Sequence, residues 1–198
     1  MVGAATFHAM FVEIVIGSLT LSTICAICCI QRAYPSPITN FRLSEAVLSA
    51  MDKAAFAGAI LGVTVMPMAI LSGTLAAPGD GAGSGLLYNK LVYSGLSLGF
   101  WGAFLTGRIR LGPGIWEDKR LNLLQAGTAA IAFLMTTTAA SIGGKLVRDE
   151  SVYDILPLWL PTDTATVLHP VISGLLLIVG IASIAVAFRF APKVRRLD

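Results

Sequence analysis

The two histidines of this chain are the residues whose type and position could support cofactor chemistry. His8 and His169 are the only histidines among the 198 residues, and each lies near one end of a long apolar stretch. The order of these stretches predicts that both imidazoles lie at a similar depth on the same side of a membrane. Two imidazoles on different helices at one depth are what axial ligation of a b-type heme requires. The pattern therefore predicts one heme b, with His8 and His169 as ligands of its iron.

Other residues at the same predicted level could complete such a site. Glycines without side chains would let a flat macrocycle approach a helix, and basic side chains could pair with its propionates. The predicted cofactor-binding residues are His8, His169, Gly143, Gly144, Lys90, Lys145 and Arg148. The alternative is an ordinary interfacial role, in which His8 contacts headgroups and the His169-Pro170 pair simply begins a helix.

Glu13 is the one acidic residue inside the first apolar stretch. An ionisable group within a membrane span is costly and is by default a candidate functional residue. Glu13 follows His8 by five residues, which places it roughly 140° around a helix and about 7–8 Å deeper. The two side chains should therefore not share a metal. Glu13 could carry a proton, for example for a quinone, or it could be a protonated carboxyl that is hydrogen-bonded to Thr136, Thr137 or Thr138.

The elements that must position these residues follow from composition. Hydrophobic residues make up 56% of the chain and charged residues only 13%, about half of what a soluble domain carries. This composition excludes a disordered chain, and no basic stripe of the kind that binds nucleic acid is present. A spanning helix needs roughly 20 mostly apolar residues. Five stretches qualify, over residues 6–30, 54–75, 86–107, 121–144 and 165–188. We therefore predict one all-α domain over 1–198, a bundle of five transmembrane helices.

The basic residues predict the orientation of this bundle. Lys90, Lys145 and Arg148 would lie on one side, and the other eleven of the 14 Lys and Arg residues on the opposite side. Because positive charge collects in cytoplasmic loops, the N-terminus should lie outside and the C-terminus in the cytoplasm of a multi-pass cell-membrane protein.

Local signals predict how the helices begin and pack. Ser44 should cap the second helix, Pro67 should kink it, and Asp52 with Lys53 should mark the cytoplasmic interface. Two sets of small residues should form helix contacts: Gly58 with Gly62, and Gly95 with Gly99 and Gly102. The three cysteines, Cys25, Cys28 and Cys29, are interpreted as small buried apolar residues, with acylation at the membrane edge as the alternative.

Two segments resemble a known membrane domain. Residues 8–17 read His-Ala-Met-Phe-Val-Glu-Ile-Val-Ile-Gly, and residues 143–147 read Gly-Gly-Lys-Leu-Val. They resemble the His-Pro-x-x-Val-His-Phe-Pro-Ile-Gly opening and the Gly-Gly-x-Leu-Val ending of a prokaryotic four-helix membrane domain of unknown function. The third span, with Asn89 and Leu91 leading to Arg108, is also similar. The resemblance covers roughly the first four spans.

That domain is often fused to c-type cytochrome or Rieske modules or encoded beside them, so the resemblance implies a role in membrane electron transfer. Glu13 stands where the domain has its second histidine, and the histidine of its third helix is missing here. The resemblance therefore implies that His169, on an added helix, would replace a lost ligand.

No extramembrane segment is large enough for a catalytic domain, and no nucleotide-binding or hydrolase motif is present. We therefore expect a non-catalytic redox or structural subunit rather than an independent enzyme. The preferred function is a cytochrome b-like subunit of a respiratory or oxidative complex, working with other membrane subunits and an external c-type cytochrome or Rieske protein. The alternative is a cofactor-free structural subunit. A transporter or channel has less support, because there is no internal repeat.

Overall fold

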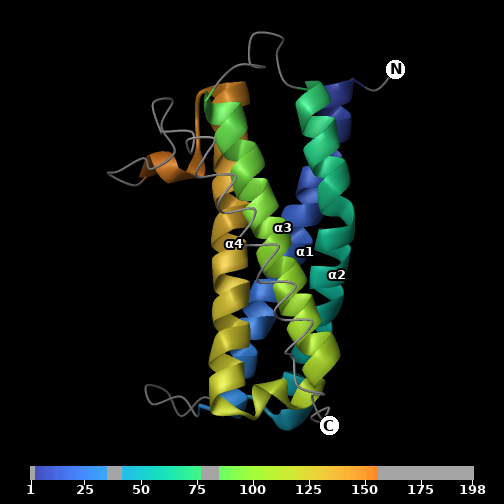
Figure 1. Ribbon diagram of the computed structural model, residues 1–198, viewed down its shortest axis with the longest axis vertical. Coiled ribbons are helices and arrows are strands. Elements are labelled where there is room, and N and C mark those ends of the chain that lie inside the picture. Colours follow the sequence, from blue (N-terminus) through green and yellow to red (C-terminus); the bar gives the residue numbers. More distant parts are fainter. Residues whose placement is uncertain (1–2, 35–41, 77–84, 156–198) are drawn as a thin grey trace, which may run out of the picture.

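Four long helices dominate the structure. The computed structural model describes residues 3–34, 42–76 and 85–155, and no β-strand occurs among them (Figure 1). The helices are α1 (Ala4–Cys29), α2 (Glu45–Ala76), α3 (Gly85–Leu111) and α4 (Lys119–Arg148). Short 3-10 turns, η1 (Ile30–Arg32), η3 (Pro113–Trp116) and η4 (Val152–Ile155), follow three of them. The predicted all-α architecture is confirmed for this part of the chain.

The first four predicted spans each correspond to one of these helices. Three of the helices, α1 continued by η1, α2 and α4, are long and apolar enough to cross a membrane. Helix α3 is of similar length but is not among these three, and Tyr88, Asn89, Lys90 and Tyr93 lie near its start. The predicted fifth span over 165–188 lies outside the described residues, so five spans and their orientation stay predictions.

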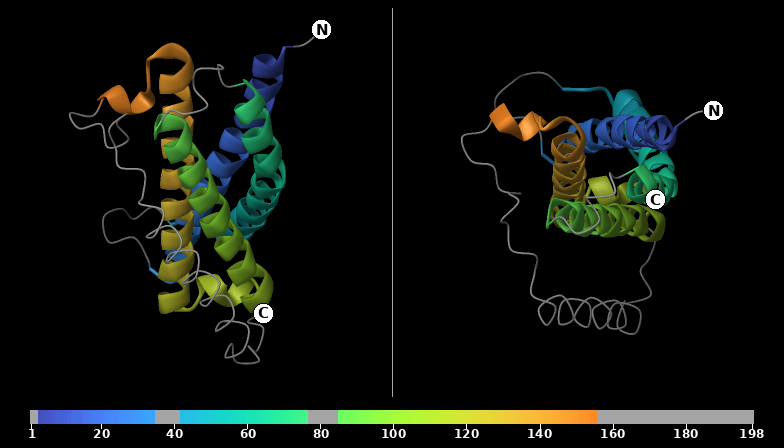
Figure 2. Two further views of the ribbon diagram at one scale, coloured as in Figure 1. Left: turned by 45° about the horizontal axis from the view of Figure 1, so that its top comes forward. Right: turned by 90° about the horizontal axis from the view of Figure 1, so that it is seen from above.

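The helices form two pairs, α1 with α2 and α3 with α4, and the four lie along the sides of a square when the bundle is seen along its axis (Figure 2). We call the end where α1 begins the N-terminal end; α2 ends there, α3 begins there and α4 ends there (Figure 1). At the opposite end, the core contains large aromatic side chains. Phe104 packs edge-on against Trp101, with centroids 5.5 Å apart, and against Trp116, with centroids 6.5 Å apart.

Glycine allows the close contact between α1 and α2. A Cβ atom at Gly58 would lie 2.7 Å from the backbone oxygen of Ser18, and one at Gly62 would overlap the side chain of Leu19. This confirms the first predicted pair as a helix contact. The second prediction is wrong for the described helices: a Cβ at Gly95, Gly99 or Gly102 would meet no atom of them within 4 Å. These three glycines lie on a face of α3 that no described helix covers.

Helix ends follow the predicted signals. The backbone N–H of Val47 donates to Oγ of Ser44, which confirms Ser44 as the cap of α2. The carboxylate of Asp118 caps α4 by accepting from the N–H groups of Arg120 and Leu121, both at 2.9 Å. Helix α2 runs without interruption through Pro67 and is curved, as expected of a helix that contains proline (Figure 2). Cys25 and Cys29 are buried, as interpreted from the sequence, whereas Cys28 is only half-buried, and none of the three forms a disulfide.

Candidate functional site

The candidate site is a cavity of about 410 Å³ in the half of the bundle nearest the N-terminal end. All four helices line it, from His8 on α1, Gly73 on α2 and Lys90 on α3 to Gly143 on α4. Most of its wall consists of Ala, Gly, Val and other apolar residues. Large aromatic side chains fill the opposite half of the core, whereas the small residues in this half leave the cavity between the helices. The volume lies within the range of about 300–1,000 Å³ that is usual for small-molecule sites.

The imidazole of His8 is held against α2. Its Nδ1 lies 3.1 Å from Oγ of Ser72, whose hydroxyl donates to the carbonyl of Ala69 at 3.2 Å. With the hydroxyl proton directed to Ala69, the oxygen of Ser72 is free to accept the Nδ1–H of His8. Nε2 then carries the lone pair and is the nitrogen that could ligate a metal. The ring also rests on Gly73, where a Cβ atom would lie 2.8 Å from Cε1 of the imidazole.

Basic side chains line the cavity. Lys90, His8 and Arg148 are among the lining residues, and within the described part of the chain no Asp or Glu lines it. The ammonium of Lys90 reaches across from α3 to α4, where a Cβ at Gly143 would lie 3.2 Å from Nζ. The missing side chain at Gly143 therefore leaves room for the lysine. A cavity with apolar walls and several basic groups is suited to an amphipathic anion.

The far end of the cavity is closed by a buried hydrogen-bond cluster. Oγ of Ser97 lies 2.6 Å from Oγ1 of Thr136, and the indole N–H of Trp101 donates to the same oxygen at 3.2 Å. Ser97 and Thr136 both line the cavity. The cluster joins α3 to α4 and separates the cavity from the aromatic core beneath it.

Five of the seven residues predicted to bind a cofactor line this cavity. They are His8, Lys90, Gly143, Gly144 and Arg148. Lys145 does not line the cavity: its ammonium donates to the backbone oxygen of Asp149 at 2.8 Å and pairs with Asp154 at 3.1 Å. Lys145 is at the predicted depth but on another face of α4. The remaining residue, His169, lies outside the described part of the chain.

Glu13 does not belong to the cavity. It is exposed on the outward face of α1 and makes no hydrogen bond or ion pair with the described residues. The predicted bond to the threonines of α4 is wrong, because each of them has other partners. Thr136 joins the cluster with Ser97, while Thr137 and Thr138 lie 2.7 and 3.3 Å from the hydroxyl of Tyr153.

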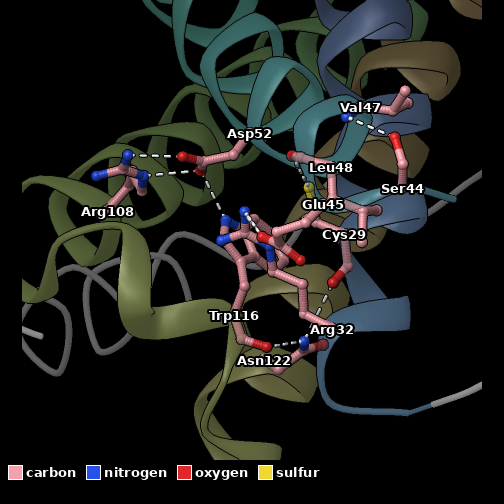
Figure 3. Close-up of polar contacts among 10 residues, drawn as sticks. All are labelled: Cys29, Arg32, Ser44, Glu45, Val47, Leu48, Asp52, Arg108, Trp116 and Asn122. Carbon is pink, nitrogen blue, oxygen red and sulfur yellow. Dashed lines mark hydrogen bonds and ion pairs between the residues drawn. The ribbon is translucent and has the colours of Figure 1, made fainter. Parts of the chain in front are cut away.

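A second polar cluster lies at the opposite end of the bundle, and the sequence analysis missed it. Asp52, which is 3% exposed, accepts two hydrogen bonds from Arg108, from Nε at 2.8 Å and from an amino group at 2.7 Å (Figure 3). The indole N–H of Trp116 also donates to Asp52 at 2.7 Å. The carboxylate therefore ties α2 to α3 and to η3. Asp52 itself is buried between helices, whereas its neighbour Lys53 is exposed, and the position of both at the cytoplasmic interface stays a prediction.

Asn122 extends this cluster to α1 and α4. Its amide donates to the carbonyl of Trp116 at 2.5 Å and to that of Cys29 at 3.3 Å (Figure 3). Asp52 accepts from three donors of the protein, and Asn122 donates to two carbonyls, while its buried Oδ1 accepts no hydrogen bond from the described residues. The cluster joins all four helices and acts as a structural brace. The signal that could have found it is an acidic residue and an arginine at the same end of neighbouring predicted helices.

Comparison with known proteins gives no relative: no protein family, no curated protein and no solved structure matches this chain. The resemblance to the four-helix membrane domain remains a prediction. Within the described ranges, no group of three or more His, Cys, Asp and Glu side chains could hold a metal ion. An iron within a porphyrin needs only axial ligands from the protein, so this finding does not bear on the heme prediction.

Proposed function

We propose that the chain is a membrane subunit of an electron-transfer complex and holds one heme b in the cavity at the N-terminal end. The observation that carries the proposal is the convergence of His8, Lys90, Gly143, Gly144 and Arg148 on one cavity. These residues were selected as heme-binding from sequence alone, and they come from three different helices. His169 is the proposed second axial ligand.

The residues of the cavity suit this cofactor. Ser72 fixes His8 in the tautomer whose Nε2 can bind iron, and such a second partner orients the ring of most metal-binding histidines. Lys90 and Arg148 supply positive charge for two propionates, which a neutral quinone would not use. The apolar wall would exclude water. The bound heme would supply one-electron chemistry, while the protein sets its position and its surroundings.

The proposed placement in the membrane follows the distribution of charge. With five spans, the N-terminal end faces the outside and the cavity opens near the outer leaflet. An external donor or acceptor, such as a c-type cytochrome or a Rieske protein, would then exchange electrons there. Other membrane subunits would complete the complex.

A reduced-minus-oxidised visible spectrum of the purified chain tests the proposal. We expect a heme b band that disappears in His8→Ala. Lys90→Met and Lys145→Met form a matched pair, because both remove a lysine at one depth but only Lys90 lines the cavity. Lys90→Met should lower heme retention severalfold, whereas Lys145→Met should leave heme retention unchanged. A colourless wild-type protein that stays colourless after reconstitution with heme would overturn the proposal.

A cofactor-free structural subunit is the second candidate. It is favoured by the face of α3 around Gly95, Gly99 and Gly102, which no described helix covers and which could receive a helix of a larger partner. A stable, colourless protein that purifies only together with another membrane subunit would support this function instead.

A further inference from the structure

The outward face of α1 carries a carboxyl group among apolar side chains. Glu13 is exposed, and Met10, Ile14 and Leu21 around it are 45%, 38% and 51% exposed. Glu13 lies about 14 Å along the helix from Ala4, and the whole helix is about 39 Å long. If the helix is centred in a hydrocarbon core of about 30 Å, the carboxyl lies about 9 Å below the surface of that core. A carboxylate at this depth requires a partner.

The same face has room for a neighbouring helix. Gly17 lies one turn beyond Glu13, and a Cβ atom there would meet no atom of the described chain within 4 Å. Exposed glycine on a membrane helix lets another backbone approach closely. A carboxyl without a partner among the described residues and an open glycine, one turn apart on one face, therefore point to the same kind of contact.

We propose that the Glu13–Gly17 face of α1 binds a transmembrane helix of a different membrane protein, and that this helix presents a Lys or Arg side chain to Glu13. Charge complementarity identifies the occupant. A second copy of α1 docked on the same face would bring two carboxyls together. It could offer neither of them a basic partner, because Ala4–Cys29 contains no Lys or Arg. A basic side chain on the partner removes the isolated charge, and Gly17 lets the two backbones come close enough for the pair to form.

Labelling with a hydrophobic carbodiimide, read out by mass spectrometry, tests the proposal. This reagent modifies protonated carboxyl groups in apolar surroundings, and Glu13→Gln provides the blank. In native membranes, where the partner is present, Glu13 should label severalfold less than in purified protein reconstituted in phosphatidylcholine nanodiscs. Gly17→Leu should raise labelling of Glu13 in native membranes. Gly99→Leu, on the equally open face of α3, should leave it unchanged.

Two outcomes would overturn the proposal. Equally strong labelling in both preparations would mean that Glu13 faces lipid as a protonated carboxyl. Equally weak labelling in both would mean that this chain itself covers the carboxyl. Neither outcome depends on whether the cavity holds heme, since Glu13 does not line it.

Discussion

At the scale of single residues, the two ends of the bundle use polar side chains in opposite ways. Near the N-terminal end, His8 and Lys90 face a cavity to which the described residues contribute no carboxylate. At the opposite end, Asp52 is fully engaged by Arg108 and Trp116. Buried polar groups that are satisfied within the protein favour stability, whereas those left facing a cavity favour a ligand. We therefore expect ligand binding near His8 and a stabilising structural role for the residues around Asp52.

Replacing Asp52 by asparagine tests that assignment. The amide would still accept from Trp116, but the charge of Arg108 would lose its counterion in a buried setting. Breaking a buried ion pair in this way costs about 3–5 kcal/mol, and we expect a loss of this size in the free energy of unfolding. Denaturant titration in mixed micelles measures it.

The matched control is Glu45→Gln, which makes the same chemical change in a pair with Arg32 whose glutamate side chain is 72% exposed. Exposed pairs contribute little, so this variant should lose less than about 1 kcal/mol. Equal losses in the two variants would contradict the bracing role of Asp52.

At the scale of helices, glycine decides which surfaces meet. Gly58→Ala would place a methyl group against the backbone oxygen of Ser18, which cannot move without shifting α1. Overpacking of this kind costs about 1–3 kcal/mol, and the unfolding midpoint should fall accordingly.

Gly99→Ala is the control, since its methyl group would meet no described atom within 4 Å. There alanine should be neutral or stabilising by up to about 1 kcal/mol, because glycine is the poorer helix former. A control as damaging as Gly58→Ala would show that the α3 face is covered.

The sequence predicts the helices better than the contacts between them. Apolar runs located the four described helices, but α2 begins at Glu45, nine residues before the predicted span. Hydropathy marks the part of a helix that enters the hydrocarbon, while a cap such as Ser44 marks where the helix starts.

The sequence predicts the depth of the site residues in the membrane, but it does not predict on which face of its helix each residue lies. Lys90 and Lys145 lie at one level, yet only Lys90 enters the cavity. Each residue turns a helix by about 100°, and a single sequence does not fix which face of α4 looks inward. The pair of Asp52 with Arg108 escaped prediction for a related reason. It joins residues 56 positions apart, and the way α2 and α3 lie together brings the two side chains into contact.

At the scale of the whole molecule, the orientation of the bundle determines on which side of the membrane the cavity opens, and the number of spans determines where the two chain ends lie. Five spans place the two chain ends on opposite sides of the membrane, whereas four place both on one side. The distribution of Lys and Arg favours the first arrangement with the N-terminus outside. The described helices bring Glu117 to the opposite end of the bundle and Glu150 to the N-terminal end, and both residues are exposed.

Single cysteines at these positions would report the arrangement directly. In a chain whose three native cysteines are replaced by alanine, a membrane-impermeant thiol reagent should label Glu150→Cys in intact cells. Glu117→Cys and Asp198→Cys should react only after lysis, because both would lie in the cytoplasm. If Asp198→Cys reacts in intact cells together with Glu150→Cys, the chain has an even number of spans. If Glu117→Cys reacts in intact cells and Glu150→Cys does not, the bundle is inverted and the cavity opens toward the cytoplasm, so that an external redox partner could not reach it.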